Sequence, residues 1–415
     1  MRFPVACAAL FLLGFTAPAQ QRETAEQAEA RARAFQAKGD AVNALAAYEQ
    51  AIQLAPKSAR LRDEAGFVLA AMQRYQEAIE KFRRAIELDP KFALAHYHLG
   101  ALHLVLREQE PGLTALRTAA GLDPKNFEYR YRYGFALNEA GQYAEAAPEL
   151  RAATALNANS ADAWSNLGLA LQRTEDFAGS LDAYRRAVDL DPPNPFCRNG
   201  YGIALVKAGR GDDALKQFEE VLKANPADQT ARFNIGFALM QKGDLEQAEK
   251  QFRDIIAADP SVAVAHYNLA VALRQKDDIP GATAELRKAI ELDPSMAESH
   301  YTLGLILWQN GDFEETASEM RAAIALRPGY ADAHLRLGTA LQQMDDLDGA
   351  IPELKEAIRL NPSDPGAYNT LGQVLRKKGD AAGSKAAFAE GAKARARAGE
   401  DKAKMLQKGM GGGKQ

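Results

Sequence analysis

The sequence predicts an all-α fold of stacked helix pairs, an α-solenoid, from three observations. Prolines recur with a step of 34 residues, interrupted only at Ala158: Pro56, Pro90, Pro124, Pro192, Pro226, Pro260, Pro294, Pro328 and Pro362. Within each interval, apolar or small residues are spaced by three and four, as on one face of a helix. Between the two apolar runs lie residues that end one helix and begin another. A fixed period of this length indicates repeats that stack on one another.

Counting back from each proline divides the chain into eleven repeats and two terminal segments. The repeats are residues 25–58, 59–92, 93–126, 127–160, 161–194, 195–228, 229–262, 263–296, 297–330, 331–364 and 365–398. Positions 1 to 34 below refer to this numbering within a repeat. The last repeat has no closing proline and continues into alanines and charged residues from Ala386 to Lys408. We expect a capping helix there, and a flexible basic tail within residues 399–415, from Gly409 onward.

Each repeat is expected to hold two amphipathic helices separated by a short turn. Apolar or small residues at positions 4, 7, 8 and 11 define the first helix, and those at 20, 24 and 27 define the second. Six repeats have glycine at position 15, which can end a helix in the left-handed conformation. Seven have aspartate at position 16, which can cap the second helix. The aspartates are Asp40, Asp176, Asp244, Asp278, Asp312, Asp346 and Asp380.

The first 19 residues have the layout of a secretory signal peptide. Arg2 precedes an apolar run from Val5 to Phe15, and Ala17 and Ala19 flank Pro18. We expect cleavage near Ala19 and export to the periplasm or the extracellular space, with an uncleaved membrane anchor as the alternative. After cleavage Cys197 is the only cysteine, so the mature chain can form no internal disulfide.

The bulk composition excludes several classes of protein. Apolar residues make up 47% of the chain, charged residues 26%, and the formal net charge is -4. These values are ordinary for a helical protein and predict no nucleic-acid partner. A cysteine scaffold or a cysteine-rich metal site is also excluded.

The fullest copy of the unit, residues 161–194, resembles the tetratricopeptide repeat family. The matching residues are Trp164, Leu167, Gly168, Leu171, Tyr184, Ala187 and Pro192, with Ser180 where the family prefers alanine. Small residues at positions 8 and 20 let the two helices approach closely. The resemblance implies a right-handed superhelix whose first helices line a concave surface. It also implies a protein that holds peptides or assembles complexes.

Catalytic and metal-binding motifs are not found in the sequence. Four histidines stand at position 4: His96, His266, His300 and His334. The last three lie in consecutive repeats, and all four are expected to pack within their repeats, not to converge on one ion. A zinc contact built from His96, His98 and His103 stays open as a remote alternative. The acidic run at Asp345 does not match a calcium loop, because Met344 and Lys355 occupy ligand positions. No cofactor and no enzymatic activity are predicted.

A candidate groove is expected on the opposite face of the first helices, at positions 2, 5, 9 and 12. Asparagines at position 6 could add hydrogen bonds to a ligand backbone. Position 9 often holds asparagine in the family and is apolar in most repeats here. The candidate residues are Phe67, Tyr97, Tyr131, Phe135, Asn166, Leu169, Phe196, Ile203, Phe233, Asn234, Phe237, Tyr267, Asn268, Tyr301, Leu305, Trp308 and Leu335. An exposed apolar strip marks a contact site. For the tyrosines, packing between neighbouring first helices is an equally good interpretation, and we refer to it below as tiling.

Three functions remain open from the sequence. The first is a non-catalytic scaffold that binds a peptide or protein segment in an apolar concave groove, in the assembly of envelope complexes. The second is a self-associating structural assembly factor, which would be a homo-oligomer. The third and most distant is an enzyme or metal-binding protein whose site is built from several repeats.

Overall fold

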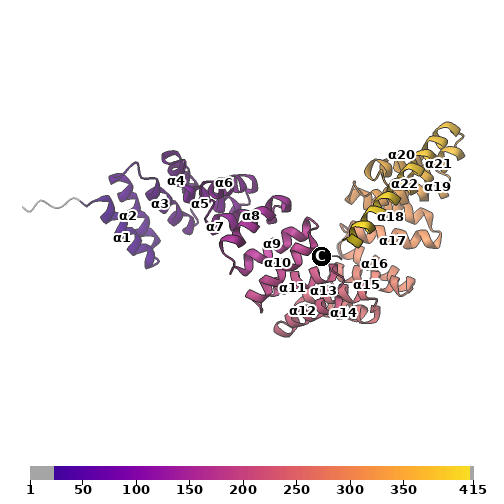
Figure 1. Ribbon diagram of the computed structural model, residues 1–415, viewed down its shortest axis with the longest axis horizontal. Coiled ribbons are helices and arrows are strands. Elements are labelled where there is room, and N and C mark those ends of the chain that lie inside the picture. The colour runs from indigo at the N-terminus through magenta and orange to yellow at the C-terminus, as the bar shows by residue number, and fades with distance from the viewer. Residues whose placement is uncertain (1–22, 412–415) are drawn as a thin grey trace, which may run out of the picture. The chain divides into compact units, whose positions relative to one another are not determined.

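The computed structural model describes residues 23–411, and this part of the chain contains helices and turns with no strand. Within each of the two compact units described below, consecutive helices form antiparallel pairs that stack on one another (Figure 1). The predicted all-α solenoid is therefore confirmed. The segment predicted to be a signal peptide, residues 1–19, lies outside the described residues.

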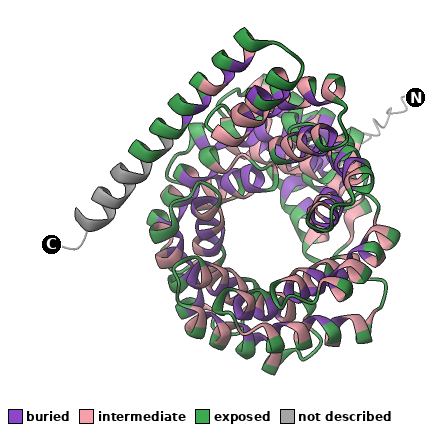
Figure 2. Ribbon diagram, turned by 90° about the vertical axis from the view of Figure 1, so that its right-hand side faces the viewer, coloured by how far each residue is buried: buried purple, intermediate pink, exposed green. Residues whose placement is uncertain are grey.

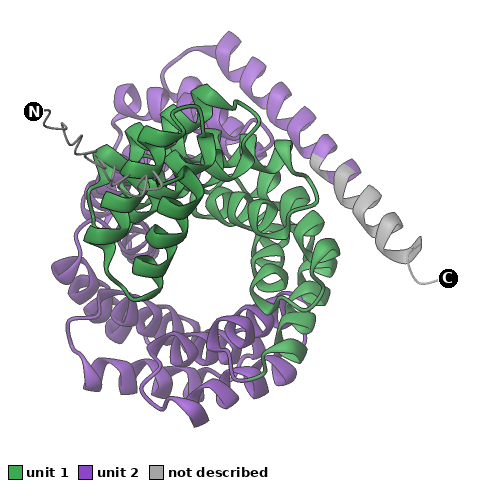
Figure 3. Cartoon of the chain, turned by 90° about the vertical axis from the view of Figure 1, so that its left-hand side faces the viewer, with its two compact units in different colours: residues 1–192 green, residues 193–415 purple. Residues whose placement is uncertain are grey.

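The chain divides into two compact units at Pro192 and Pro193 (Figure 3). The first unit contains α1 (Ala25–Ala37), α2 (Ala41–Leu54), α3 (Ala59–Ala71), α4 (Tyr75–Leu88), α5 (Ala93–Val105), α6 (Gln109–Leu122), α7 (Phe127–Glu139), α8 (Tyr143–Leu156), α9 (Ala161–Arg173) and α10 (Phe177–Leu190). The second contains α11 (Pro195–Lys207), α12 (Gly211–Ala224), α13 (Gln229–Lys242), α14 (Leu245–Ala258), α15 (Ala263–Gln275), α16 (Ile279–Leu292), α17 (Ala297–Asn310), α18 (Phe313–Leu326), α19 (Ala331–Gln343), α20 (Leu347–Leu360), α21 (Pro365–Lys377) and α22 (Ala381–Gly411). Every odd-numbered helix begins at position 1 of a repeat.

Position 15 adopts the left-handed conformation in all eleven repeats, including the five that lack glycine. The six glycines, such as Gly39 and Gly311, have φ between 72° and 88°. Gln73, Arg107, Glu175, Asp277 and Asp345 have φ of 61–66°. The turn between the helices therefore requires this conformation even where a side chain makes it unfavourable.

Six of the seven predicted aspartate caps form. The carboxylates of Asp40, Asp176, Asp244, Asp278, Asp346 and Asp380 each accept a hydrogen bond from the backbone N–H three residues later. The prediction is wrong for Asp312, whose side chain makes no capping hydrogen bond. Two acidic residues in the first turn of α18, Glu314 and Glu315, still place negative charge at that helix N-terminus.

Glycine at position 8 lets the two helices of a pair touch. A Cβ added to Gly134 would lie 2.7 Å from the Leu150 side chain, and one added to Gly202 would lie 2.3 Å from the Phe218 ring. Leu150 and Phe218 are fully buried, so neither can move aside easily. A side chain at position 8 would therefore force the paired helices apart.

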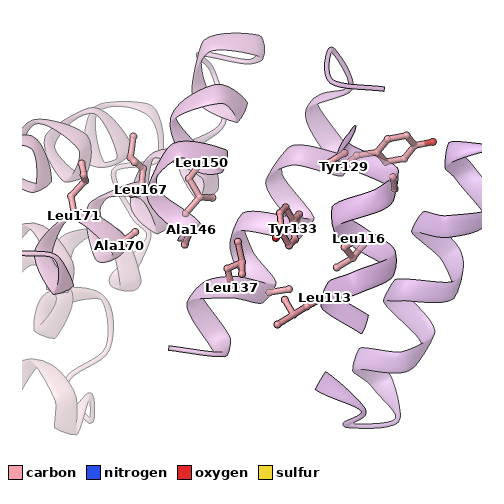
Figure 4. Close-up of a cluster of buried hydrophobic side chains, with 14 of the residues drawn as sticks. Leu113, Leu116, Tyr129, Tyr133, Leu137, Ala146, Leu150, Leu167, Ala170 and Leu171 are labelled. Carbon is pink, nitrogen blue, oxygen red and sulfur yellow. The ribbon is translucent and has the colours of Figure 1, made fainter. Parts of the chain in front are cut away.

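Buried residues follow the sides of the helices that face a neighbouring helix (Figure 2). One cluster in the first unit links α6, α7, α8 and α9 through Leu116, Leu137, Leu150 and Leu167 (Figure 4). Cys197 is a buried cysteine in α11. Within the first unit, this part of the core therefore runs from pair to pair as a series of contacts between neighbours, as expected for stacked repeats.

The C-terminal helix is longer than predicted. α22 extends to Gly411, although the sequence predicts a flexible end from Gly409. Its alanine-rich composition favours helix, and helix can propagate past single glycines once it has begun. Within residues 23–411, no helix combines the length and the apolar character needed to cross a bilayer.

Candidate functional site

The candidate groove residues lie on the first helices and differ widely in exposure. Phe67 is 45% exposed, Phe196 52% and Phe237 38%. Most of the other candidates are half-buried. Exposed phenylalanine rings contribute little to the packing of a helix pair. These three rings are therefore the most exposed part of the apolar strip.

In the first unit, an aromatic path connects three consecutive repeats. The Phe67 ring on α3 lies 5.3 Å from the His98 ring on α5. The Tyr97 ring lies 5.6 Å from His98 and 5.1 Å from the Tyr129 ring on α7. These centroid distances are within the range of favourable ring pairs. The tiling role that the sequence left open for the tyrosines thus applies to Tyr97.

Tyr97 is also held by a polar contact at its far end. Its hydroxyl donates a hydrogen bond of 3.0 Å to the Glu128 carboxylate in the next repeat. Burial and the neighbouring Glu128 carboxylate raise the pKa of Tyr97 to about 12. The hydroxyl therefore stays protonated at physiological pH and links α5 to α7.

Along α7, Tyr131 connects two further rings. Tyr131 lies 5.7 Å from Phe127 and 6.2 Å from Phe135. Phe135 lines a hollow of about 360 Å³ together with Leu104, Arg107 and Glu139. A predicted groove residue thus lies at a hollow with both apolar and charged walls.

In the second unit, several predicted groove residues are partly used in packing. Trp308 lies 5.0 Å from Phe313 and packs against the core of its repeats. Tyr301 lies 4.7 Å from Tyr330. Phe233 lies 6.3 Å from Phe252, which is buried between paired helices. Part of the Trp308 surface is therefore used in packing.

A second hollow opens on the first-helix face of the last three repeats. It has a volume of about 460 Å³, and its walls include Tyr301 and Leu335 from the predicted strip. Asp332, Arg336 and Asp364 also line it. These charged residues were not predicted, because the groove was predicted from apolar side chains and asparagines. Arg336 occupies position 6.

The three predicted asparagines have different surroundings. Asn166 is only 7% exposed, its amide donates to the Asp162 carbonyl, and its own backbone carbonyl accepts from Asn138. It is therefore unavailable to a ligand, and the prediction for Asn166 is wrong. The amide of Asn268 donates to the Val264 carbonyl, and that of Asn234 donates to Asn199. The last two are half-buried and keep their side-chain oxygens as possible acceptors.

A buried polar pair beside the aromatic path, Asp63 and His98, was also not predicted. Asp63 is 1% exposed, and its two carboxylate oxygens lie 2.9 and 3.1 Å from Nδ1 of His98. Phe67 and Phe82 flank the imidazole. The only sign of this pair in the sequence is an aspartate at position 5 of one repeat and a histidine at position 6 of the next.

Histidines at position 4 form a recurring clasp between repeats. Nδ1 of His266, His300 and His334 lies 2.6–2.7 Å from a glutamate at position 23, namely Glu285, Glu319 and Glu353. Nε2 lies 3.0–3.2 Å from the carbonyl of the proline that closes the previous repeat. Carboxylates and carbonyls only accept hydrogen bonds, so both contacts form when the ring carries both protons. Arg130 makes the equivalent pair of contacts with Glu149 and Pro124.

The histidines proposed for a zinc contact do not share a ligand position. His96 contacts the Pro90 carbonyl, His98 contacts Asp63, and His103 contacts Glu108. Among the residues that the structure describes, no group of three histidine, cysteine or acidic side chains could hold a metal ion. The arrangement on the first helices can provide apolar contacts, hydrogen-bond acceptors and single charges, which are suited to binding.

Comparisons with known proteins identify a family of helical repeats. A family model described as tetratricopeptide repeat matches residues 136–195, 202–263, 235–297, 267–331, 301–365 and 335–401, and a second, described as TPR repeat, matches residues 66–105. No curated protein matches the sequence.

Two solved structures share the architecture at low identity. A tetratricopeptide repeat protein from Parabacteroides merdae ATCC 43184 is 14% identical with a TM-score of 0.55, and the match covers 60% of this chain and 98% of the other. Yeast Tom70 is 14% identical with a TM-score of 0.51, covering 92% and 96%. Likenesses at this identity concern the fold alone.

Proposed function

The chain belongs to the tetratricopeptide repeat family, and from this premise we propose that it is a non-catalytic scaffold that binds a segment of another protein on the face of its first helices. The family's fold supports a role in protein interactions in general. The observation that carries the finer proposal is the exposure of Phe67, Phe196 and Phe237 on that face. Large aromatic rings that stay exposed and add little to the packing of the protein indicate a contact surface.

The two hollows supply the chemistry that such a segment would meet. In the first unit, Phe135 and Leu104 provide apolar walls, and Arg107 and Glu139 provide charges. In the second unit, Tyr301 and Leu335 stand beside Asp332 and Arg336. A bound segment would therefore place apolar side chains against the rings and polar groups against the charged residues. We extend the proposal to the cell envelope on the basis of the signal-like residues 1–19.

Alanine substitution of the exposed rings tests this function. The variant Phe67→Ala, Phe196→Ala, Phe237→Ala should lose at least about tenfold in partner recovery from envelope extracts, because each ring contributes buried apolar area to the complex. Its helical signal should be unchanged. Trp308 is left intact, since its removal would also disturb packing.

Phe177 provides the matched control. It is 44% exposed, as exposed as the three test rings, but begins a second helix, α10. Phe177→Ala should leave partner recovery unchanged. An equal loss in both variants, or no loss in the triple variant, would refute binding on the first-helix face. Recovery of a second copy of this chain alone would favour the self-association hypothesis.

A further inference from the structure

Repeat 3 retains only half of the clasp that repeats 8, 9 and 10 form. Nε2 of His96 lies 3.1 Å from the Pro90 carbonyl, which corresponds to one of the two contacts of His266. Position 23 of this repeat is Ala115, which has no carboxylate to offer. Within residues 23–397, no side chain forms a hydrogen bond with Nδ1 of His96. One polar atom of a half-buried ring is therefore unused at this point.

A hollow of about 640 Å³ lies where the glutamate side chain would stand. Its walls come from α4, α5 and α6 of the first unit and include Ile86, Leu99, Pro111, Ala115 and His96. The size is within the range of small-molecule sites, and so is the combination of apolar walls with a few polar groups. The hollow lies mostly on second helices, away from the surface used in the proposed function.

Repeat 11 shows that alanine at position 23 opens the hollow. Ala387 occupies this position and Tyr368 occupies position 4. Both line a hollow of about 300 Å³, together with Ile358 and Leu371, which stand at the positions of Ile86 and Leu99. Repeat 5 also has alanine there, Ala183, but position 4 is filled by Trp164, with Arg186 lying 4.7 Å from the Trp164 ring. The hollow of repeat 3 is thus the larger one and the one with a histidine.

The charges at the rim allow an acidic ligand. Arg83 lines the hollow and forms no ion pair with any side chain of the described part of the chain. Glu87 also lines it, but its carboxylate is paired with Arg84 at 2.5 Å. Of the two glutamates that line the hollow, only Glu110 forms no ion pair with another described residue. A ligand carboxylate that enters the hollow would be attracted by Arg83 and His96 and repelled by Glu110.

We propose that this hollow binds a small apolar carboxylate, whose carboxylate group contacts Nδ1 of His96 as Glu285 contacts His266. The chain itself pairs a histidine at position 4 with a glutamate at position 23 in three repeats, with 2.6–2.7 Å between Nδ1 and the carboxylate oxygen. The apolar tail of the ligand lies against Ile86, Leu99 and Pro111. Such a ligand is either a free acid with a short chain or the terminal carboxylate of a peptide that ends in an apolar residue.

Titration calorimetry of the full chain with four probes tests the proposal. Octanoate should bind about tenfold more tightly than octan-1-ol, since the pair with His96 is a charge-assisted hydrogen bond. Octylamine should bind more weakly than octanoate. N-acetylleucine identifies the source of the carboxylate: tighter binding of N-acetylleucine supports a peptide terminus, and tighter binding of octanoate supports a free acid.

Variants of the hollow separate this site from nonspecific binding. Ala115→Glu should abolish octanoate binding, because the new side chain fills the hollow and pairs with His96. Ala387→Glu is the matched control in repeat 11 and should leave octanoate binding unchanged. His96→Gln should reduce the affinity for octanoate about tenfold and leave that for octan-1-ol unaltered. Glu110→Gln should raise the affinity for octanoate, because it removes the opposing charge.

Three results would overturn the proposal. One is equal affinity for octanoate and octan-1-ol. Another is a preference for octylamine that Glu110→Gln weakens, which would identify a cation site. The third is an equal loss of binding in Ala115→Glu and Ala387→Glu. Because His96→Gln removes no buried apolar group, its result stands even if Ala115→Glu folds poorly.

Discussion

Two neighbouring positions of the first helix, 8 and 9, differ sharply in how much the repeats vary. Position 8 is glycine in nine repeats and alanine in the other two, whereas position 9 ranges over arginine, phenylalanine, leucine, isoleucine, valine, threonine, glutamine and alanine. Position 8 faces the second helix of its own pair, where an added Cβ would collide with a buried side chain. Position 9 points to the other face. Packing thus restricts position 8 to glycine or alanine and lets position 9 vary.

The largest effect is expected from filling position 8. Gly134→Val should lower the free energy of unfolding by about 3 kcal/mol, because its Cβ would lie 2.7 Å from the buried Leu150 side chain. Urea denaturation of the full chain measures the loss. Gly121→Ala is the control, since an added Cβ there meets nothing within 4 Å, and it should stabilise by about 0.5 kcal/mol. Equal effects would mean that position 8 is not constrained by packing.

A smaller effect is expected from the ion pair at the start of the first-helix face. The Arg60 guanidinium donates two hydrogen bonds to the nearly buried Glu29 carboxylate and holds the pKa of that carboxyl below its usual value. Arg60→Met, which keeps the apolar stem, should cost about 1 kcal/mol at pH 7, a low figure because Arg60 is half exposed.

The pH dependence of this loss has a definite sign. A lowered pKa in the folded state stabilises the protein above the unfolded pKa of about 4.3, and the stabilisation disappears as pH falls through the folded value. Denaturation of both proteins between pH 7 and pH 2 should therefore show their stabilities converging in acid, below about pH 4. A difference that persists unchanged to pH 2 would contradict the role assigned to Glu29.

A gain of about 0.5 kcal/mol is expected at the turn between the helices. Gln73 has a φ of 61°, so Gln73→Gly should relieve backbone strain that exceeds the entropic cost of glycine in the unfolded chain. Thermal unfolding measures the gain. The reciprocal change, Gly141→Ala, places a side chain at a φ of 72° and should destabilise by about 1 kcal/mol. Destabilisation by Gln73→Gly would show that the glutamine side chain makes a contact that outweighs its strain.

The sequence predicts the fold in detail because the signals for it repeat. The closing proline, the turn glycine and the capping aspartate each recur at one position of the repeat. An exception such as Asp312 or Gln73 therefore does not hide the pattern. What could not be predicted depends on contacts between specific neighbours. The Asp63 and His98 pair joins two repeats and occurs once, and the burial of Asn166 depends on Asn138 in the preceding repeat.

The candidate site was predictable in part for the same reason. Counting positions identifies the face on which Phe67 and Phe237 lie, because the helix period fixes it. It does not reveal which rings also cover the core. Trp308 and Phe233 share that face, yet neighbouring side chains, Phe313 and Phe252, occupy part of their surface. The exposure of a ring depends on the size of the side chains beside it, and its position in the repeat does not reveal that size.

The effect on stability should also be small at position 9, where the central claim is tested. Phe67→Ala and Phe237→Ala should each change the free energy of unfolding by less than about 1 kcal/mol, because the rings are partly exposed. The most direct measurement replaces Phe67, Phe237 or the control Phe177 with the photoreactive p-benzoylphenylalanine and irradiates the native envelope. Crosslinks to another protein should form from the first two positions and not from the third. Equal crosslinking from all three, or none from Phe67 and Phe237, would contradict binding on the first-helix face.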